Sequence, residues 1–253
     1  MLSRLRQFFR PAAPARPVEL DLALYDQVRL RFPALQDLDA DERTLLKTRC
    51  TEILQAKSFQ GAGGFEPRDA DRLAVALLAA LPVLHLGLDW YRDFHTFILY
   101  PAEFIADIEE IDEDGLVHSG RDLRSGEAWA RGPVVLAMND VWESGQGEGF
   151  NVVVHELAHQ LDQCNGEANG FPPLHAGMDA AAWTDAFSTG YERLQQDLEL
   201  GREPTIDPYG AESPAEFFAV ACEFYFDVPD WLAEHYPAVY AQLKRFFRSA
   251  YQE

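Results

Sequence analysis

The sequence predicts a mostly helical α+β fold with a small mixed or antiparallel sheet. Helical patterns stand towards both ends of the 253-residue chain, and the strand-like segments lie between them. Strands and helices do not alternate, as they would in a doubly wound parallel sheet. No GxGxxG or GxxxxGKS/T sequence occurs, so the chain offers no phosphate-binding loop of those kinds.

Composition and charge limit the classes of partner. A hydrophobic fraction of 47% suffices for a full core, so we expect an ordinary globular protein. The formal net charge of −21 repels nucleic acid and anionic membrane surfaces, and neither is expected as a partner. The three cysteines, Cys50, Cys164 and Cys222, form no CxxC pair, which favours a reducing compartment over a disulfide framework.

Residues 1–20 are expected to form a flexible N-terminal segment. They contain four arginines and several prolines, but no apolar run long enough for a signal peptide or a transmembrane helix. The remainder, residues 21–253, is expected to fold as a single domain.

Two helices are predicted in the N-terminal part. Within residues 35–57, apolar side chains recur near helical spacing behind the cap candidates Asp37 and Asp39. The glycine-rich stretch at 61–64 ends this helix. A second helix, over about 68–81, is rich in alanine and leucine and apolar nearly all round, which is typical of a core helix.

The middle of the chain contains the strand candidates. Residues 94–101 are rich in aromatic and β-branched side chains and predict a strand, and the acidic stretch at 109–115 is expected to form a solvated turn. Residues 132–140 predict a second strand. We expect it at an edge of the sheet, because Pro133 cannot donate to a strand ladder. Helices then dominate, over about 179–200, 213–227 and 236–251.

The stretch "HELAH" carries the strongest chemical signal. His155 and His159 are four residues apart, so on a helix both imidazoles can reach one metal ion at about 2.0–2.1 Å. Glu156 projects about 100° away, where it can reach a water bound to that ion. The mostly apolar residues "NVVV" before the first histidine indicate a buried helix, from near Gly149 to near Gly166. Burying two imidazoles there without polar partners would cost free energy. These observations favour a metal site over two ordinary polar helix positions.

A catalytic zinc ion needs a third protein ligand, and the residues alone leave two candidates open. Glu216 and Glu223 are seven residues apart on the predicted helix at 213–227, each among large apolar side chains. Glu223 has a further carboxylate, Asp227, four residues on, the spacing at which a carboxylate can steady a ligand histidine. Glu216 has a phenol, Tyr209, seven residues before it, which can donate to a developing oxyanion.

Other polar residues near the motif have plainer interpretations. Asp162, three residues after His159, either orients a ligand histidine or is a solvated helix carboxylate. The remaining histidines considered lack paired spacing, and a structural role is favoured for each of them: His85, His95, His118 and His175.

Seven segments between about residues 60 and 236 together form a pattern that can be compared with known families. They are "GF" (64–65), "LPVLHLGLDW" (81–90), "FHTFILYPAEF" (94–104), "GLVHSG" (115–120), "GPVVLAMND" (132–140), "GFNVVVHELAHQLD" (149–162) and "SPAEFFAVACEFYF" (213–226). In these segments, taken in order, the sequence resembles the Mlc titration factor A family of bacterial zinc metallopeptidases. A series of matches in one order is much more specific than HExxH alone.

The resemblance implies a zincin-like metallopeptidase fold over residues 21–253, with HExxH on the active-site helix. It implies one zinc ion held by His155, His159 and Glu216, with Glu156 as the catalytic glutamate. The family's catalytic core is in turn similar to that of anthrax lethal factor, in which a tyrosine precedes the ligand glutamate by seven residues. Tyr209 repeats that spacing here.

The resemblance further implies a cytoplasmic, aminopeptidase-type enzyme acting on peptides. In enteric relatives it implies binding of the glucose-responsive repressor Mlc, so a transcriptional repressor of that type is a second expected partner. The predicted edge strand near 133–138 is expected to bind substrate backbone by strand addition. The alternative is a zincin-like scaffold that sequesters a regulatory protein with little hydrolysis. Glu156 argues against it, because a scaffold has no need of that carboxylate.

Overall fold

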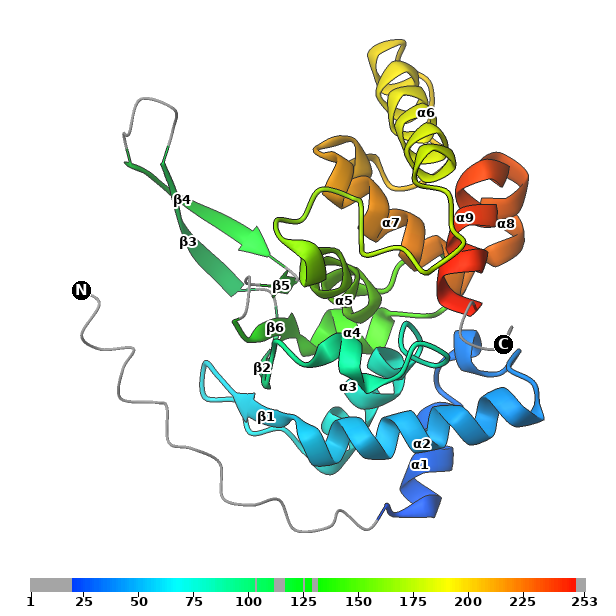
Figure 1. Ribbon diagram of the computed structural model, residues 1–253. Coiled ribbons are helices and arrows are strands. Elements are labelled where there is room, and N and C mark those ends of the chain that lie inside the picture. Colours follow the sequence, from blue (N-terminus) through cyan, green and yellow to red (C-terminus); the bar gives the residue numbers. More distant parts are fainter. Residues whose placement is uncertain (1–19, 103, 112–116, 125, 129–131, 249–253) are drawn as a thin grey trace.

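The structure, a computed structural model, describes residues 20–102, 104–111, 117–124, 126–128 and 132–248. Helices stand at both ends of this range and strands lie between them, which confirms the predicted α+β class (Figure 1). Residues 1–19 lie outside the described part, so the flexible N-terminal segment stays a prediction. Within that part, no helix combines the length and the apolar character that crossing a membrane requires.

The N-terminal helices are α1 (Leu22–Arg29), α2 (Ala40–Ala56) and α3 (Asp69–Ala80), and the predicted helices at 35–57 and 68–81 correspond to α2 and α3. A capping box begins α2, since Asp39 Oδ1 accepts the Glu42 N–H at 2.9 Å and Glu42 Oε2 accepts the Asp39 N–H at 3.1 Å. Helix α3 is buried on almost every side, as its composition predicts.

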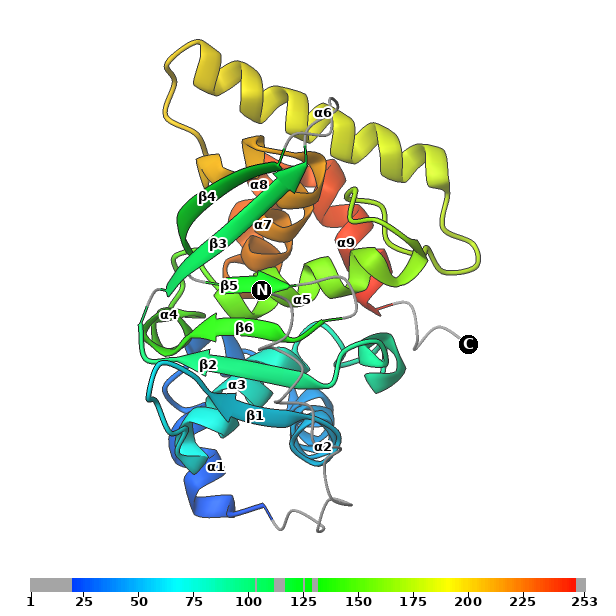
Figure 2. The same ribbon diagram turned by 90° about the vertical axis from the view of Figure 1, so that its left-hand side faces the viewer.

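The main sheet has four strands in the order β1 (Ser58–Gly61), β2 (Thr96–Tyr100), β6 (Val134–Ala137) and β5 (Gly126–Ala128). Strands β1, β2 and β6 run parallel, and β5 pairs antiparallel with β6. The sheet is therefore mixed, and most of its pairing is parallel. Figure 2 shows the four strands side by side, with β5 next to α5 (Val152–Asp162).

The prediction of an edge position for the strand near 133–138 is wrong. Val134 in β6 pairs with Phe97 of β2 on one side and Ala128 of β5 on the other. Pro133 precedes β6, so its missing N–H leaves the ladder intact. Among the described strands, β1 and β5 form the edges of this sheet.

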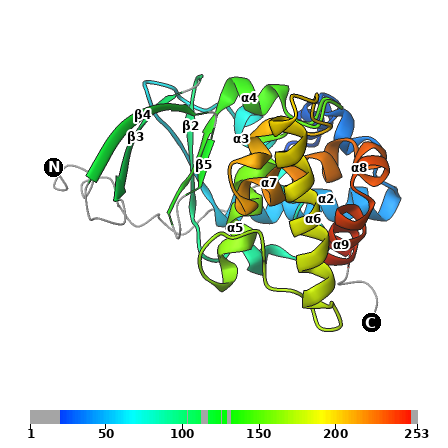
Figure 3. The ribbon, with the colours of Figure 1, turned by 90° about the horizontal axis from the view of Figure 1, so that it is seen from above.

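A separate antiparallel pair, β3 (Phe104–Ile111) and β4 (Val117–Arg124), forms a hairpin that stands away from the helices (Figures 1 and 3). The solvated turn predicted at 109–115 is wrong for residues 109–111, which belong to β3. Residues 112–116 lie outside the described part of the chain.

The C-terminal part is helical. Its elements are α4 (Met138–Glu143), α5, α6 (Ala180–Glu199), α7 (Pro214–Asp227), α8 (Pro229–His235) and α9 (Pro237–Arg248), with short 3-10 turns at η4 (Gln163–Asn165) and η5 (Pro208–Ala211). Three of the predicted helices correspond to α6, α7 and α9, as far as residue 248. The motif helix predicted from near 149 to near 166 corresponds to α5 and the turn η4 that follows it.

One continuous cluster of buried apolar side chains joins both ends of the chain. Helix α5 lies at its centre, between α3 and α7 (Figure 1). Its three consecutive valines, Val152, Val153 and Val154, are at most 4% exposed. The motif helix therefore rests on the core along most of its surface, which fixes the direction of the side chains on its remaining face.

Candidate metal centre

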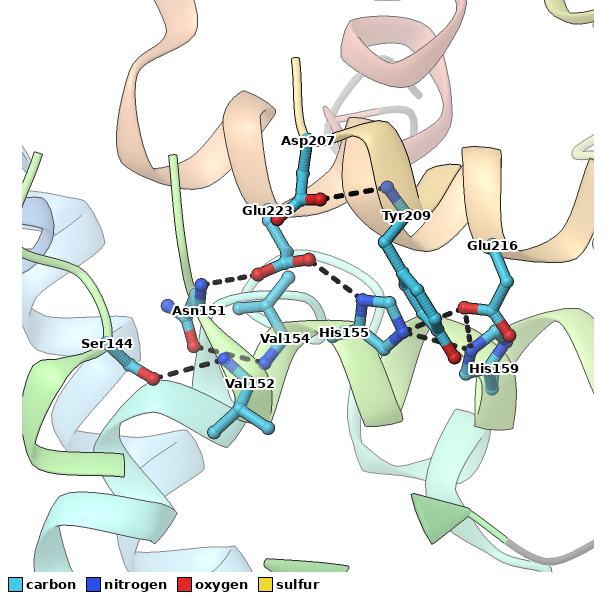
Figure 4. Close-up of polar contacts among 10 residues, drawn as sticks. All are labelled: Ser144, Asn151, Val152, Val154, His155, His159, Asp207, Tyr209, Glu216 and Glu223. Atoms are coloured by element: carbon cyan, nitrogen blue, oxygen red, sulfur yellow. Dashed lines mark hydrogen bonds and ion pairs between the residues drawn. The ribbon is translucent and has the colours of Figure 1, made fainter. Parts of the chain in front are cut away.

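Helix α5, which carries both motif histidines, begins at an end capped by side chains. Asn151 Oδ1 accepts the Val154 N–H at 3.1 Å, and Ser144 Oγ accepts the Val152 N–H at 3.1 Å. These contacts satisfy N–H groups that the first turn of a helix leaves without partners. The start of α5, and so the placement of the histidines one turn later, is held from two sides (Figure 4).

Helix α7 brings the first of the two candidate glutamates to the histidines. Ser213 Oγ accepts the Glu216 N–H at 3.2 Å, and Pro214 occupies the first helical position, where a missing N–H carries no penalty. Glu216 therefore lies in the first turn of α7. Figure 4 shows its carboxylate directed down onto the two imidazoles of α5.

Three donor atoms meet at one point. The Nε2 atoms of His155 and His159 are 3.3 Å apart, and Glu216 Oε2 lies 3.0 Å from the first and 3.2 Å from the second. All three residues are partly buried. The structure thus brings together the three residues that the family resemblance implies as the ligand set.

This arrangement fits a tetrahedral metal ion. Ligand atoms at about 2.0–2.2 Å from such an ion are roughly 3.3–3.6 Å from one another, so the three donors need to separate by only a few tenths of an ångström. Two imidazoles and one carboxylate are a donor set of catalytic zinc, which leaves a fourth position open for water or substrate.

Glu223, the second candidate, lies behind His155 instead of in the cluster. Its Oε1 accepts the Nδ1–H of His155 at 2.8 Å, and its Oε2 accepts the Asn151 N–H at 2.5 Å. With a proton held on Nδ1 in this way, His155 Nε2 can offer its lone pair to a metal ion in the cluster. Glu223 therefore orients a candidate ligand and ties it to the start of α5.

The cluster shifts the proton affinities of its members. Burial lowers the pKa of His155, but the hydrogen bonds to Glu216 and Glu223 outweigh it and raise that pKa well above its usual value. Burial raises the pKa of Glu216, but the two histidines outweigh it and lower that pKa. Protons and a metal ion compete for these atoms, so the affinity for metal increases with pH.

The two predicted catalytic side chains lie next to this cluster. Glu156 follows His155 on α5, is 5% exposed, and is close enough to raise the pKa of that histidine. Tyr209 lies on η5 and is 43% exposed, with its ring centre 5.8 Å from that of His155. Figure 4 shows the Tyr209 ring extending past His155 towards His159 and Glu216.

Asp162 fits neither of its two sequence-based interpretations. Its carboxylate is fully buried and accepts the N–H groups of three consecutive residues, Asn169, Gly170 and Phe171, at 2.7, 2.6 and 2.9 Å. Burial raises its pKa despite these hydrogen bonds. Asp162 is therefore the anchor of the loop that follows α5. The carboxylate and the N–H groups that it binds are seven to nine residues apart, and no sequence pattern marks such a contact.

Substitution of this anchor tests its structural role. We expect Asp162→Ala to lower the free energy of unfolding by at least about 2 kcal/mol, because one buried and two part-buried N–H groups lose a charged acceptor, and each such loss costs up to about 1–3 kcal/mol. Urea unfolding of the metal-free protein measures the change. The control, Asp185→Ala at an exposed position of α6, should change it by less than about 0.5 kcal/mol. Equal effects of both substitutions would contradict the anchor role.

Asp227, whose spacing from Glu223 suggested a carboxylate that steadies a ligand histidine, anchors a loop instead. Its carboxylate accepts the Gly147 N–H at 3.0 Å and the Gly149 N–H at 2.7 Å, in the loop that leads into α5. Gly149 has φ +78°, and a Cβ there would lie 2.5 Å from the Phe224 ring. Glu223 and Asp227, one turn apart on α7, thus hold the entry of the motif helix in place.

The histidines interpreted as structural lie apart from the cluster wherever the structure describes their side chains. His175 Nε2 donates to the Phe246 carbonyl at 2.9 Å, and His85 lies 3.5 Å from Glu42. His95 belongs to no ligand cluster of the described residues. His118 lies in β4, where its side chain is outside the described part.

Comparisons with known proteins identify a metallo-peptidase family. The model of a family described as glucose-regulated metallo-peptidase M90 matches residues 8–248. Several curated relatives carry the name Mlc titration factor A. One from Escherichia fergusonii is 37% identical, covering 86% of this chain and 83% of that protein. One from Escherichia coli is 37% identical (89% and 86%), and one from Salmonella paratyphi B is 38% identical (87% and 83%).

Proposed function

The chain belongs to the glucose-regulated metallo-peptidase M90 family, and from that membership we propose that it is a zinc-dependent aminopeptidase. The family implies a metal ion and a peptide substrate. The observation that carries the proposal is the meeting of His155 Nε2, His159 Nε2 and Glu216 Oε2 within 3.3 Å of one another. Zinc is the ion proposed, because two imidazoles, one carboxylate and an open position are its catalytic donor set.

The proposed reaction divides the work among four groups. Bound zinc supplies Lewis acidity and lowers the pKa of water in its open position. Glu156 accepts a proton from the water that attacks the peptide carbonyl, and delivers it to the amine as the C–N bond breaks. The Tyr209 hydroxyl donates to the oxyanion that forms on the carbonyl oxygen. Glu223 keeps His155 in position throughout.

The observed strand order makes β5, and not β6, the strand beside which a peptide substrate could pair. Strand β6 is paired on both sides, whereas β5 is an edge strand of the described sheet and lies beside α5. We therefore propose that the substrate backbone pairs with β5, within reach of the motif helix.

A second partner and a location follow from the relatives. Their name, Mlc titration factor A, links them to Mlc, and we propose that this chain likewise binds a transcriptional repressor of that type in the cytoplasm. The competing proposal is a scaffold that binds such a regulator and hydrolyses little. The buried Glu156 beside the cluster favours the enzyme.

Amino-acid p-nitroanilides test the function directly. Zinc-loaded protein should cleave derivatives with a free amino group, lose this activity with a chelator, and leave the N-acetylated derivatives intact. Cleavage of both forms would replace the aminopeptidase proposal by an endopeptidase. If neither form is cleaved and a purified Mlc-type repressor binds the protein, the scaffold proposal replaces the enzyme.

Tyr209→Phe tests the oxyanion role. We expect zinc content to remain at the wild-type level and kcat to fall by about 100-fold, as for the loss of one oxyanion donor. Because Tyr209 is 43% exposed, the substitution should leave the fold intact. Tyr240→Phe on α9 is the matched control and should keep the wild-type kcat. An unchanged kcat in Tyr209→Phe would remove this residue from the mechanism.

A further inference from the structure

A pocket of about 320 Å³ opens between α6, the first turn of α7 and residues 169–171. Its floor consists of aromatic rings, among them Trp183, Phe187 and Phe217, each at most 7% exposed. At its mouth, Thr184 and Ser188 on α6 are exposed. The pocket is therefore open to solvent at the rim and apolar within.

The pocket borders the first turn of α7, which carries Glu216, and the loop that follows the motif helix α5. Pro214 lines it and belongs to the same first turn of α7 as Glu216. Asn169 and Gly170 line it as well, and they are held by Asp162, three residues after His159. A helical turn rises about 5.4 Å and an extended peptide about 3.3 Å per residue. Pro214 and Glu216 lie within one such turn of each other, a separation comparable to that of side chains one or two residues apart in an extended peptide.

The wall formed by residues 169–171 is held by several hydrogen bonds. Asp162 binds three consecutive backbone N–H groups of the loop, and Gly170 O accepts the Trp183 indole N–H at 3.0 Å. Gly170 has φ +78°, and a Cβ there would lie 2.5 Å from Pro214 O, so the loop lies directly against α7. A pocket held in this way loses little conformational freedom when it binds a ligand.

The size and lining of the pocket indicate its ligand. Trp183 and Phe187 stack with ring centres 4.4 Å apart, and Phe217 meets Phe187 edge-on at 6.1 Å. Such a floor favours apolar groups, and the one charged lining residue, Glu192, would repel a phosphate or a carboxylate. Ligand pockets run from roughly 300 to 1,000 Å³, so this one suits a single large side chain and not a nucleotide-sized cofactor.

We propose that this pocket binds one large apolar side chain, aromatic or branched aliphatic, of the peptide substrate. The inference rests on the proposed peptidase function, since the ligand is part of the peptide bound at the metal centre. It assigns to α6 and to the loop anchored by Asp162 the selection of substrates by side chain.

The test uses two substitutions that fill the pocket from its rim. Ser188→Phe and Thr184→Phe each place a ring at the mouth from an exposed position of α6, and Gln196→Phe places the same ring at an exposed position of α6 that does not line the pocket. The substrates are alanine pentapeptides with phenylalanine at one position at a time. We measure kcat/KM with zinc-loaded protein, and the dissociation constants of the same peptides with the Glu156→Gln forms.

We expect the wild type to favour phenylalanine over alanine at one position by at least about tenfold, since a single methylene in an apolar pocket is worth roughly 10–200-fold. Both pocket variants should reduce that preference to less than about threefold, and Gln196→Phe should keep it. The inference is overturned if the preference survives in both pocket variants, or if no position favours phenylalanine in either cleavage or binding.

Measuring both cleavage (kcat/KM) and binding (the dissociation constants) distinguishes a failure of this inference from a failure of the proposed function. If no peptide is cleaved, but binding favours phenylalanine and loses that preference in Ser188→Phe, the pocket is supported and the peptidase proposal fails. If peptides are cleaved with a preference that neither pocket variant changes, the peptidase proposal is supported and the pocket assignment fails.

Discussion

Replacing Glu216 by alanine is expected to abolish zinc binding and all measurable peptidase activity. Glu216 Oε2 lies 3.0 and 3.2 Å from the two imidazole nitrogens, so it is the third donor of the cluster. Without it only two protein ligands remain, fewer than the three that catalytic zinc takes. Zinc stoichiometry by elemental analysis and the zinc dissociation constant by chelator competition measure the loss.

The matched control is Glu223→Gln, seven residues further along α7. Its amide oxygen can accept the Nδ1–H of His155 and so keep the imidazole in orientation, while the amide NH2 cannot accept the Asn151 N–H. Loss of the negative charge should weaken zinc binding by about 10–100-fold, and the protein should still load at stoichiometric zinc. If Glu216→Ala keeps its zinc while Glu223→Gln loses it, the ligand role belongs to Glu223.

Glu156→Gln is expected to retain zinc and to lose about 10²–10⁴-fold in kcat, the range for removing a general base. The amide has the shape of the carboxylate but takes up no proton from the attacking water. Because Glu156 is 5% exposed and lies outside the donor set, the ligand geometry should persist. The measurement is kcat on the best p-nitroanilide, with zinc content determined on the same samples.

Glu199→Gln, at an exposed position near the end of α6, removes one carboxylate without touching the cluster and should keep full activity. It controls for the change in net charge. Equal zinc content together with equal kcat in Glu156→Gln and wild type would show that another group accepts the proton.

The sequence was sufficient to predict the motif helix and the geometry of its two histidines, because the i, i+4 spacing is a local property of a helix. It was not sufficient to choose between Glu216 and Glu223 on physical grounds. The two glutamates lie on nearly the same face of α7. Glu216 contacts Nε2 of His155 and Glu223 contacts Nδ1, and this assignment depends on the position of α7 along the axis of α5. That position is a tertiary property, and the family resemblance supplied the preference.

The sheet was harder to predict than the helices for a related reason. Pro133 suggested an edge strand, but it precedes β6, and the true neighbour, β5, spans only Gly126–Ala128. So short a strand carries no alternating pattern from which to predict it. The anchors Asp162 and Asp227 escaped prediction because their partners are backbone N–H groups, which have no sequence signature.

The central claim is that one zinc ion binds between α5 and the first turn of α7. An anomalous difference map at the zinc absorption edge, from crystals of the zinc-loaded protein, tests it most directly. The account predicts one strong peak at about 2.0–2.2 Å from His155 Nε2, His159 Nε2 and Glu216 Oε2. A peak elsewhere in the molecule, with none at these three atoms, would contradict it.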